Sequence, residues 1–311
     1  MKTDISNREE RLKMKKKLIF KGVGTALVTP FRDGEIDYSS LDKLIEWQIT
    51  SGVDALVIGG TTGEAATLSE VERYTLYEHA VRIIDGRCKV MLGCGTNDTR
   101  VALSHTQFAE SLGCDGALHV TPYYNKGTEE GVYRHYALIA EASSLPIMLY
   151  NVPQRTGVNL GVNLLSRLAE YENIVGIKEA SDSFLRMSTL ASFGERLPLY
   201  AGNDSGIYPT LALGGVGVVS VASNVIPCQI KRLTEMYFSG ELTESLKLQC
   251  ELLPFINSLF AETNPTPVKY AMEKLSLAPS DVRLPLYDAR DSTKQAIDDE
   301  LSRLSELGYL C

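Results

Sequence analysis

A lysine stands in the middle of an apolar, strand-length stretch of the sequence. Lys178 lies in the run 174–180, "IVGIKEA", and by strand alternation it shares a face with Ile174 and Gly176. Burial disfavours the charged form of lysine, which lowers the pKa below its ordinary value of about 10.4 and leaves an amine that can attack a carbonyl carbon. Lysine is rarely buried without such a purpose. The alternative is a lysine that reaches into solvent, because the run ends two residues later.

Two loop segments that follow other apolar runs carry polar side chains. In "YNVPQRTG", Tyr150 ends a strand-like run, and Arg155 follows a proline that fixes the loop. The arginine could present its two-pronged donor to a carboxylate, although a solvent-exposed loop arginine is the more common case. In "TPYYNKG", Tyr123 and Tyr124 form a pair of the kind that more often packs on a surface or at an interface than takes part in catalysis.

The segment "GGTTGEAATLSEVER" is expected to form a tight turn followed by a helix. Gly59, Gly60 and Gly63 let the backbone turn and bring amide groups close to a ligand. Ser69 and Glu72 have the spacing of a capping box that starts a helix. A turn without a ligand is an equal alternative, because an isolated glycine pattern is a weak signal.

Strand-like and helical segments alternate along most of the chain, and they must position these side chains. The strand-like runs are residues 22–31, 55–60, 89–95, 116–122, 146–152, 174–180, 197–202 and 216–222. They are apolar on both faces, as in a parallel sheet covered by helices, and eight such units predict an α/β fold of the TIM-barrel type. Active-site residues in this fold come from the C-terminal ends of the strands and the loops that follow.

The chain is expected to consist of three parts. Residues 1–19 mix both charge signs and are predicted to form a solvated tail, within which Met14 offers an alternative start site. Residues 20–240 contain the barrel. In residues 241–311 no strand signal returns, and segments 242–260, 267–275 and 293–307 have helical patterns, so we expect a helical extension packed on the barrel.

The composition indicates a globular protein with small-molecule partners. Of 311 residues, 44% are apolar and 23% charged, and a formal net charge of −8 leaves no broad basic surface for nucleic acid or anionic lipid. No apolar run approaches the roughly 20 residues that span a bilayer, and the start of the chain lacks the apolar core of a signal peptide. The six cysteines include no CxxC pair, so we expect reduced cytoplasmic thiols.

No metal or nucleotide cofactor is expected. The four histidines, His79, His105, His119 and His135, are scattered without the spacing of metal ligands and are predicted to be structural. The sequence contains no GxxxxGK[ST] phosphate-binding motif, and "GGVGVV" at residues 214–219 is explained as the turn into the eighth strand.

Five motifs, in their order and spacing, resemble the dihydrodipicolinate synthase family of the pyruvate-dependent aldolase superfamily, which includes N-acetylneuraminate lyase. They are "GGTTGEAATL", "VTPYYNKG", "YNVPQRTG", "GIKEAS" and "NPTPVKYA", and the resemblance covers nearly the whole chain from Gly22 onward. It implies a lyase that condenses pyruvate, held as a Schiff base on Lys178, with L-aspartate-4-semialdehyde. The implied product is 4-hydroxy-tetrahydrodipicolinate, formed in the first committed step of diaminopimelate and lysine biosynthesis, without any cofactor beyond the covalent imine.

The resemblance also implies a role for each matching residue. Lys178 matches the lysine that forms the imine, and Tyr150 matches the tyrosine that passes protons during imine formation and cyclisation. Thr61 matches a threonine that links Tyr150 to a second tyrosine, which Tyr124 matches and which the neighbouring subunit contributes in the family. The substrate-binding matches are Thr62 for the pyruvate carboxylate, Arg155 for the aldehyde carboxylate, and Gly202 and Val219 for the lining of the pocket.

Two alternatives remain open. A sialic acid lyase tends to have Ser-Thr in the first motif and no arginine after the fifth strand, whereas this chain has Thr61, Thr62 and Arg155. A barrel that only binds a keto acid would not need a nucleophile with a proton relay.

Family resemblance further implies a homotetramer built as a dimer of dimers. Many members are inhibited by lysine, which binds at the dimer interface through polar residues. The matching positions here are Ala65, Ala66, Glu70, Arg73 and Val101, with Asn97 and Tyr123 retained. Val101 offers no acceptor to an ammonium group and Arg73 brings a like charge, while Glu70 could compensate in part. We therefore expect weak or absent inhibition by lysine.

Overall fold

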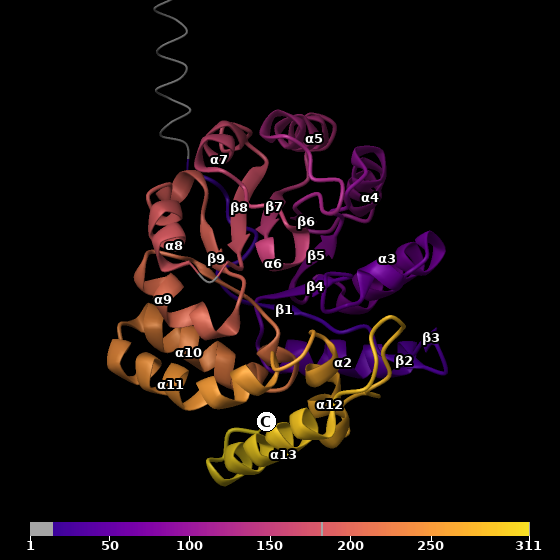
Figure 1. Ribbon diagram of the computed structural model, residues 1–311, viewed down its shortest axis with the longest axis vertical. Helices are drawn as coiled ribbons and strands as arrows, with labels where there is room; N and C mark the ends of the chain where they lie inside the picture. The colour runs from indigo at the N-terminus through magenta and orange to yellow at the C-terminus, as the bar shows by residue number, and fades with distance from the viewer. Residues whose placement is uncertain (1–14, 182, 311) are drawn as a thin grey trace, which may run out of the picture.

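Eight parallel strands close into a barrel in the computed structural model, which describes residues 15–181 and 183–310 (Figure 1). The strands follow one another around the barrel in chain order, and β1 pairs with both β4 and β10, which closes the ring. They are β1 (Gly22–Ala26), β4 (Ala55–Ile58), β5 (Lys89–Gly93), β6 (Gly116–Val120), β7 (Ile147–Asn151), β8 (Ile174–Glu179), β9 (Leu199–Ala201) and β10 (Gly217–Ser220). The expected TIM barrel is confirmed, with one barrel strand in each expected run.

Helices cover the outside of the barrel (Figure 1). They are α2 (Tyr38–Thr50), α3 (Glu70–Ile84), α4 (Thr99–Ser111), α5 (Glu129–Glu141), α7 (Val162–Leu168), α8 (Phe184–Ala191), α9 (Ile207–Ala212) and α10 (Pro227–Ser239). Five of them begin after a residue whose side chain accepts a hydrogen bond from the first turn, which fixes where the helix starts: Asp37, Ser69, Asp98, Thr128 and Ser183. The expected capping box of Ser69 and Glu72 is present.

Short elements lie in the connections. The hairpin of β2 (Phe31–Arg32) and β3 (Glu35–Ile36) follows β1, and the one-turn helix α6 (Pro153–Thr156) follows β7. The 3-10 turns are η1 (Ala65–Thr67), η2 (Gly194–Arg196), η3 (Asp204–Gly206) and η4 (Ala222–Asn224). Two of these elements, η1 and α6, belong to the loops that carry the candidate site residues.

Side chains of the strands pack in two layers. Val57, Met91 and Met148 are buried in the barrel interior, whereas their strand neighbours Leu56 and Leu149 pack outward under the helices. Because both faces are buried, the strands are continuous apolar runs rather than alternating ones.

Strand β8 departs from simple alternation near its start. Its register with β7 shifts after the first residue pair, so that Val175 packs in the interior cluster and Ile174 in the outer one. The expectation that Ile174 shares a face with Lys178 is therefore wrong. Gly176 does face the interior, since a Cβ added there would lie 3.1 Å from a ring carbon of Tyr200.

Three further helices follow the barrel, as expected. They are α11 (Leu242–Ser258), α12 (Thr266–Lys274) and α13 (Asp291–Glu306), and the expected boundary after residue 240 falls between α10 and α11. In Figure 1 the yellow helices α12 and α13 lie together beside α11, and α13 packs on both of the others.

Most of the expected N-terminal tail, residues 1–14, lies outside the described residues. In its described part, Lys16 and Ile19 are buried, so the expectation of a solvated tail is wrong for them. Lys16 Nζ donates a hydrogen bond to the carbonyl of Tyr171 at 2.5 Å. Ile19 and Phe20 pack in the interior cluster, where they supply apolar side chains that the short barrel strands do not provide.

Within the described ranges, no helix is long and apolar enough to cross a membrane. The cysteines of that part of the chain are free thiols, namely Cys88, Cys94, Cys114, Cys228 and Cys250. Cys311 lies outside the described residues.

Candidate active site

Lys178 and Tyr150 are cross-strand neighbours near the C-terminal ends of β8 and β7. Both side chains are buried, with exposed fractions of 5% and 6%. The Lys178 Nζ atom lies 4.2 Å from the centre of the Tyr150 ring. The lysine is therefore held inside the barrel mouth next to a hydroxyl-bearing ring, and it does not extend into solvent.

A cavity of about 770 Å³ opens at this end of the barrel. Thr61, Tyr150 and Arg155 line it, together with Asn264 from the C-terminal extension. Four other expected site residues, Lys178, Thr62, Gly202 and Val219, are buried but are not among the lining residues. Apart from Tyr124, the expected residues thus lie either at the cavity wall or buried in the molecule.

The loop after β4 is shaped by close backbone packing. A Cβ on Gly93 would lie 2.0 Å from the carbonyl oxygen of Gly59, and Gly59 itself has a φ of 64°, which favours glycine. The amide of Glu64 donates to the carbonyl of Thr61 at 3.1 Å, which closes the turn. The turn leaves Thr62 buried at 3% exposure and Thr61 half-buried at the cavity.

Contacts from the C-terminal extension anchor this loop, and the sequence did not predict them. Glu64 forms an ion pair with Lys269 of α12, and both side chains are almost fully buried. The backbone amide of Arg283 donates to the second oxygen of Glu64 at 2.9 Å. Asn264 Nδ2 donates to the Thr62 hydroxyl oxygen at 2.9 Å. The motif "NPTPVKYA" contains two of these residues, but its contacts join positions about 200 residues apart in the chain.

Arg155 lies on the one-turn helix α6 at the edge of the cavity. Its side chain is exposed, and its Nη2 atom donates to the backbone carbonyl of Asn264 at 3.0 Å. The guanidinium is thereby held in place with further donors available to an anionic ligand.

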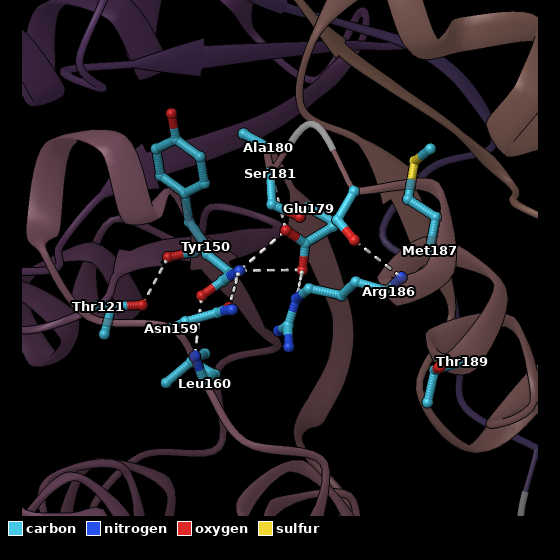
Figure 2. Close-up of polar contacts among 12 residues, drawn as sticks. Thr121, Tyr150, Asn159, Leu160, Glu179, Ala180, Ser181, Arg186, Met187 and Thr189 are labelled. Carbon is cyan, nitrogen blue, oxygen red and sulfur yellow. Dashed lines mark hydrogen bonds and ion pairs between the residues drawn. The ribbon is translucent and has the colours of Figure 1, made fainter.

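A buried polar network surrounds Glu179 (Figure 2), which follows Lys178 in β8 just as Asn151 follows Tyr150 in β7. The next residues of the two strands, Glu179 and Asn151, are also cross-strand partners, and Asn151 Nδ2 donates to both Glu179 oxygens at 2.8 and 3.0 Å. Glu179 also accepts from Arg186 Nε at 2.8 Å. Strand alternation turns this network away from the barrel interior, so it braces the two strands while the catalytic candidates face inward.

A second buried carboxyl, on Asp204 after β9, was also missed. It accepts from the Ser220 hydroxyl and from the Val221 amide at 2.9 Å; Ser220 ends β10 next to Val219, and Val221 follows it. Burial raises the pKa of this carboxyl above its usual range, although its hydrogen bonds and the nearby Lys178 lower it. The only sequence signal was its position in a loop after a barrel strand.

Tyr124 is not brought to the site within a single chain. It is 87% exposed, has a φ of 68°, and does not line the cavity, whereas Tyr123 does. Among the described residues the Thr61 side chain makes no hydrogen bond to Tyr150 or to Tyr124, so the expected relay is not closed in this chain alone.

Three histidines are buried, and one of them, His105, lines the cavity. Burial lowers the pKa of His105 and His135 to about 4 and that of His119 to about 3. In the described part of the chain, no group of three or more His, Cys, Asp or Glu side chains could hold a metal ion.

Comparison with known proteins adds independent observations. The profile of the dihydrodipicolinate synthetase family matches residues 19–304. A 4-hydroxy-tetrahydrodipicolinate synthase of Clostridium novyi is 40% identical over 289 residues, which cover 93% of this chain and 98% of that protein.

Two solved structures share the fold closely. A dihydrodipicolinate synthase of Acinetobacter baumannii, described as chloride-inhibited and complexed with pyruvate, is 38% identical with a TM-score of 0.89. A relative from Cyanidioschyzon merolae with lysine bound has the same identity and TM-score, 38% and 0.89. In both comparisons the match covers 94% of this chain and 100% of the other.

Proposed function

Because the chain belongs to the dihydrodipicolinate synthetase family, we propose which of its residues carry out the family's reaction. The chain is a lyase with the 4-hydroxy-tetrahydrodipicolinate synthase function of its curated relatives. It condenses pyruvate with L-aspartate-4-semialdehyde to 4-hydroxy-tetrahydrodipicolinate, in lysine and diaminopimelate biosynthesis. The relatives' names do not support the two alternatives, a sialic acid lyase or a keto-acid-binding barrel without activity.

The observation that carries the assignment of roles is the buried Lys178 amine beside the Tyr150 ring. The amine of Lys178 adds to the keto carbon of pyruvate, and after proton transfers the keto oxygen leaves as water. Tyr150 donates and accepts the protons of these steps through its hydroxyl group. The product is a protonated imine on Lys178.

The imine is an electron sink for the carbon-carbon bond-forming step. A proton leaves the pyruvate methyl group, and the resulting enamine attacks the aldehyde carbon, whose oxygen takes up a proton. The amino group of the aldehyde substrate then attacks the imine carbon, which closes the ring and releases Lys178. Each step moves a proton, so Tyr150 works with Thr61 and with Tyr124 of a neighbouring subunit.

Two carboxylates are bound in separate places. Thr62 and nearby backbone amides hold the pyruvate carboxylate, and Arg155 holds the carboxylate of the aldehyde. Gly202 and Val219 form part of the wall around pyruvate. The burial of Thr62, the position of Arg155 at the cavity edge, and the pyruvate bound to the A. baumannii relative support this assignment.

The assembly proposed for the chain is a homotetramer built as a dimer of dimers. Exposed side chains are available for subunit contacts: Tyr124 is 87% exposed, and Phe184 and Leu185 at the start of α8 are 64% and 78% exposed. The expectations of no cofactor beyond the imine and of a cytoplasmic location stay predictions.

A condensation assay with both substrates tests the proposed function. The wild-type chain should consume pyruvate and L-aspartate-4-semialdehyde together, and the Lys178→Ala variant should lose turnover by about three orders of magnitude or more, because the covalent step is lost. Lys247→Ala, an exposed lysine on α11, is the matched control and should keep full activity. Turnover of the Lys178→Ala variant at the wild-type rate would refute the assignment.

A further inference from the structure

The motif "NPTPVKYA" has no part in the mechanism above, yet its first residue touches both proposed carboxylate-binding side chains. Asn264 is 6% exposed and lies between α11 and α12. Its side chain contacts Thr62, and its backbone carbonyl contacts Arg155. We propose that Asn264 is a positioning residue that directs the Thr62 hydroxyl proton toward the pyruvate carboxylate and holds Arg155 at the second carboxylate. This inference rests on the proposed function.

The direction of the Thr62 proton follows from hydrogen-bond counting. A threonine hydroxyl has one proton to donate and lone pairs that accept. Asn264 Nδ2 donates to the Thr62 oxygen at 2.9 Å, so this contact uses a lone pair and leaves the proton free. Among the described residues, the Thr62 hydroxyl makes no other hydrogen bond. A free hydroxyl proton is what a carboxylate needs from a neutral side chain.

The opposite orientation of the Asn264 amide is disfavoured. In the structure Oδ1 is buried and has no hydrogen-bond partner among the described residues. If the amide were turned over, Oδ1 would take the Thr62 proton and the NH2 group would be left buried and unpaired. In protein interiors, an N–H donor without a hydrogen-bond partner is rarer than a carbonyl oxygen without one. The observed orientation is therefore the more stable one.

Asn264 is itself held firmly against the Thr62 loop. Lys269, one turn into α12, forms the buried ion pair with Glu64, two residues after Thr62. Removal of one partner from such a buried pair is strongly destabilising. The pair therefore ties the loop after β4 to α12. The Asn264 amide therefore meets Thr62 in one geometry before any substrate arrives.

Side chain and backbone of Asn264 act on different substrates. A substitution removes the amide that touches Thr62 but keeps the backbone carbonyl that accepts from Arg155. Asn264→Ala and Asn264→Asp should therefore raise KM for pyruvate and leave KM for the aldehyde nearly unchanged. Asn264→Asp should have the larger effect, because its carboxylate takes the Thr62 proton and adds negative charge near the substrate carboxylate.

Steady-state kinetics with a double-mutant cycle test the inference. We expect KM for pyruvate to rise about fivefold in Asn264→Ala and about thirtyfold or more in Asn264→Asp. In the Thr62→Val background, Asn264→Ala should change this KM by less than about twofold, because its target is gone. Asn257→Ala, an exposed asparagine on α11, is the control and should match the wild type.

Two results would overturn the inference. One is an unchanged pyruvate KM in folded Asn264→Ala, and the other is an equal effect of that substitution with and without Thr62. If Asn264→Asp does not fold, the double-mutant cycle of Asn264→Ala and Thr62→Val still tests the inference. Trapping of pyruvate by borohydride in the wild-type chain separates this outcome from a failure of the proposed function, which would leave even the wild type unmodified.

Discussion

The two substrate carboxylates are proposed to bind in one region of the molecule, through chemically different side chains. Thr62 is neutral, buried and adjacent to the interior where Lys178 lies. Arg155 is charged, exposed and fixed at the cavity edge by the Asn264 carbonyl. Under the proposed roles, the residue types separate the site of imine formation from the site of charge recognition.

Replacing Arg155 by alanine should affect only the second substrate. The aldehyde carboxylate loses a charge-assisted, two-pronged contact that contributes on the order of 2 kcal/mol, so its KM should rise about thirtyfold. Imine formation with pyruvate should continue, as judged by borohydride trapping. Arg155→Lys should recover only part of the loss, because lysine lacks the fork.

The matched control for this prediction is Arg134→Ala, an exposed arginine of α5 paired with Glu130. It should leave both KM values unchanged. If imine formation failed in Arg155→Ala as much as use of the aldehyde, the arginine would be holding the loop after β7 in place instead of binding a carboxylate.

Three neighbouring elements, α4, β6 and α5, each contribute one buried histidine. His105, His119 and His135 each have one ring nitrogen without a hydrogen-bond partner among the described residues. His119 and His135 pack edge-on against the ring of Tyr136. Burial, and for His105 the nearby Arg73, lowers the pKa of these rings to about 4, 3 and 4. The neutral imidazoles act as packing groups, as the sequence predicted.

These histidines should make stability depend on pH. The pKa values of the three rings in the folded chain lie below the unfolded value of about 6.5. At a pH between the folded and unfolded values, the unfolded chain therefore binds more protons than the folded chain. The folded state should lose stability as the pH drops from about 6.5 to about 4. One pKa unit corresponds to about 1.4 kcal/mol, so each ring is expected to contribute a few kcal/mol across this range. Urea unfolding across this range measures the loss.

His119→Gln should flatten this pH dependence, because the ring with the lowest pKa is removed. His79→Gln is the control, because the half-buried His79 of α3 pairs with Asp42 of α2, outside the cluster. An unfolding free energy that stays constant between about pH 6.5 and about pH 4.5 would contradict the assignment of buried neutral rings.

The barrel could be predicted from sequence because its signals are local. Each strand is apolar on both faces, and Lys178 was conspicuous as the polar exception in such a strand. The register shift in β8 and the buried Lys16 were missed, because they depend on which strands and carbonyls the chain meets after folding. The contacts of Asn264 and Glu64 across about 200 residues were missed for the same reason.

At the scale of the whole molecule, the role proposed for Tyr124 would link catalysis to assembly. Its exposed ring lies outside the cavity of its own chain, so a role in catalysis requires a neighbour. Tyr124→Phe and Lys178→Ala subunits should each be inactive alone, but a mixture should recover some activity. In a mixed dimer, one of the two sites then contains both an intact Lys178 and an intact Tyr124.

Subunit exchange must be measured in the same mixture, for example with two differently tagged chains. A mixture of two Lys178→Ala preparations is the control and should stay inactive. Exchange without recovered activity would place Tyr124 outside the neighbour's site.

L-Lysine bound in the outer part of the cavity should inhibit the activity only weakly. Arg73 Nη2 donates to the carbonyl of Ala65 at 2.6 Å and Nη1 to that of Gly93 at 3.3 Å, so its positive charge stays in the region where Val101 also lines the wall. An ammonium group would meet a like charge there, offset only in part by Glu70. The C. merolae relative does bind lysine, so an activity titration with L-lysine is a direct comparison. Half-inhibition below millimolar lysine would refute weak inhibition.

All the other proposed roles depend on an imine between Lys178 and pyruvate, and borohydride can trap that imine. The wild-type chain is incubated with pyruvate and borohydride, digested, and mapped by peptide mass spectrometry. A reduced pyruvate adduct should appear on the peptide that contains Lys178 and on no other lysine, and buried Lys269 and Lys16 should stay unmodified. An unmodified chain, or an adduct on another lysine, would contradict the mechanism.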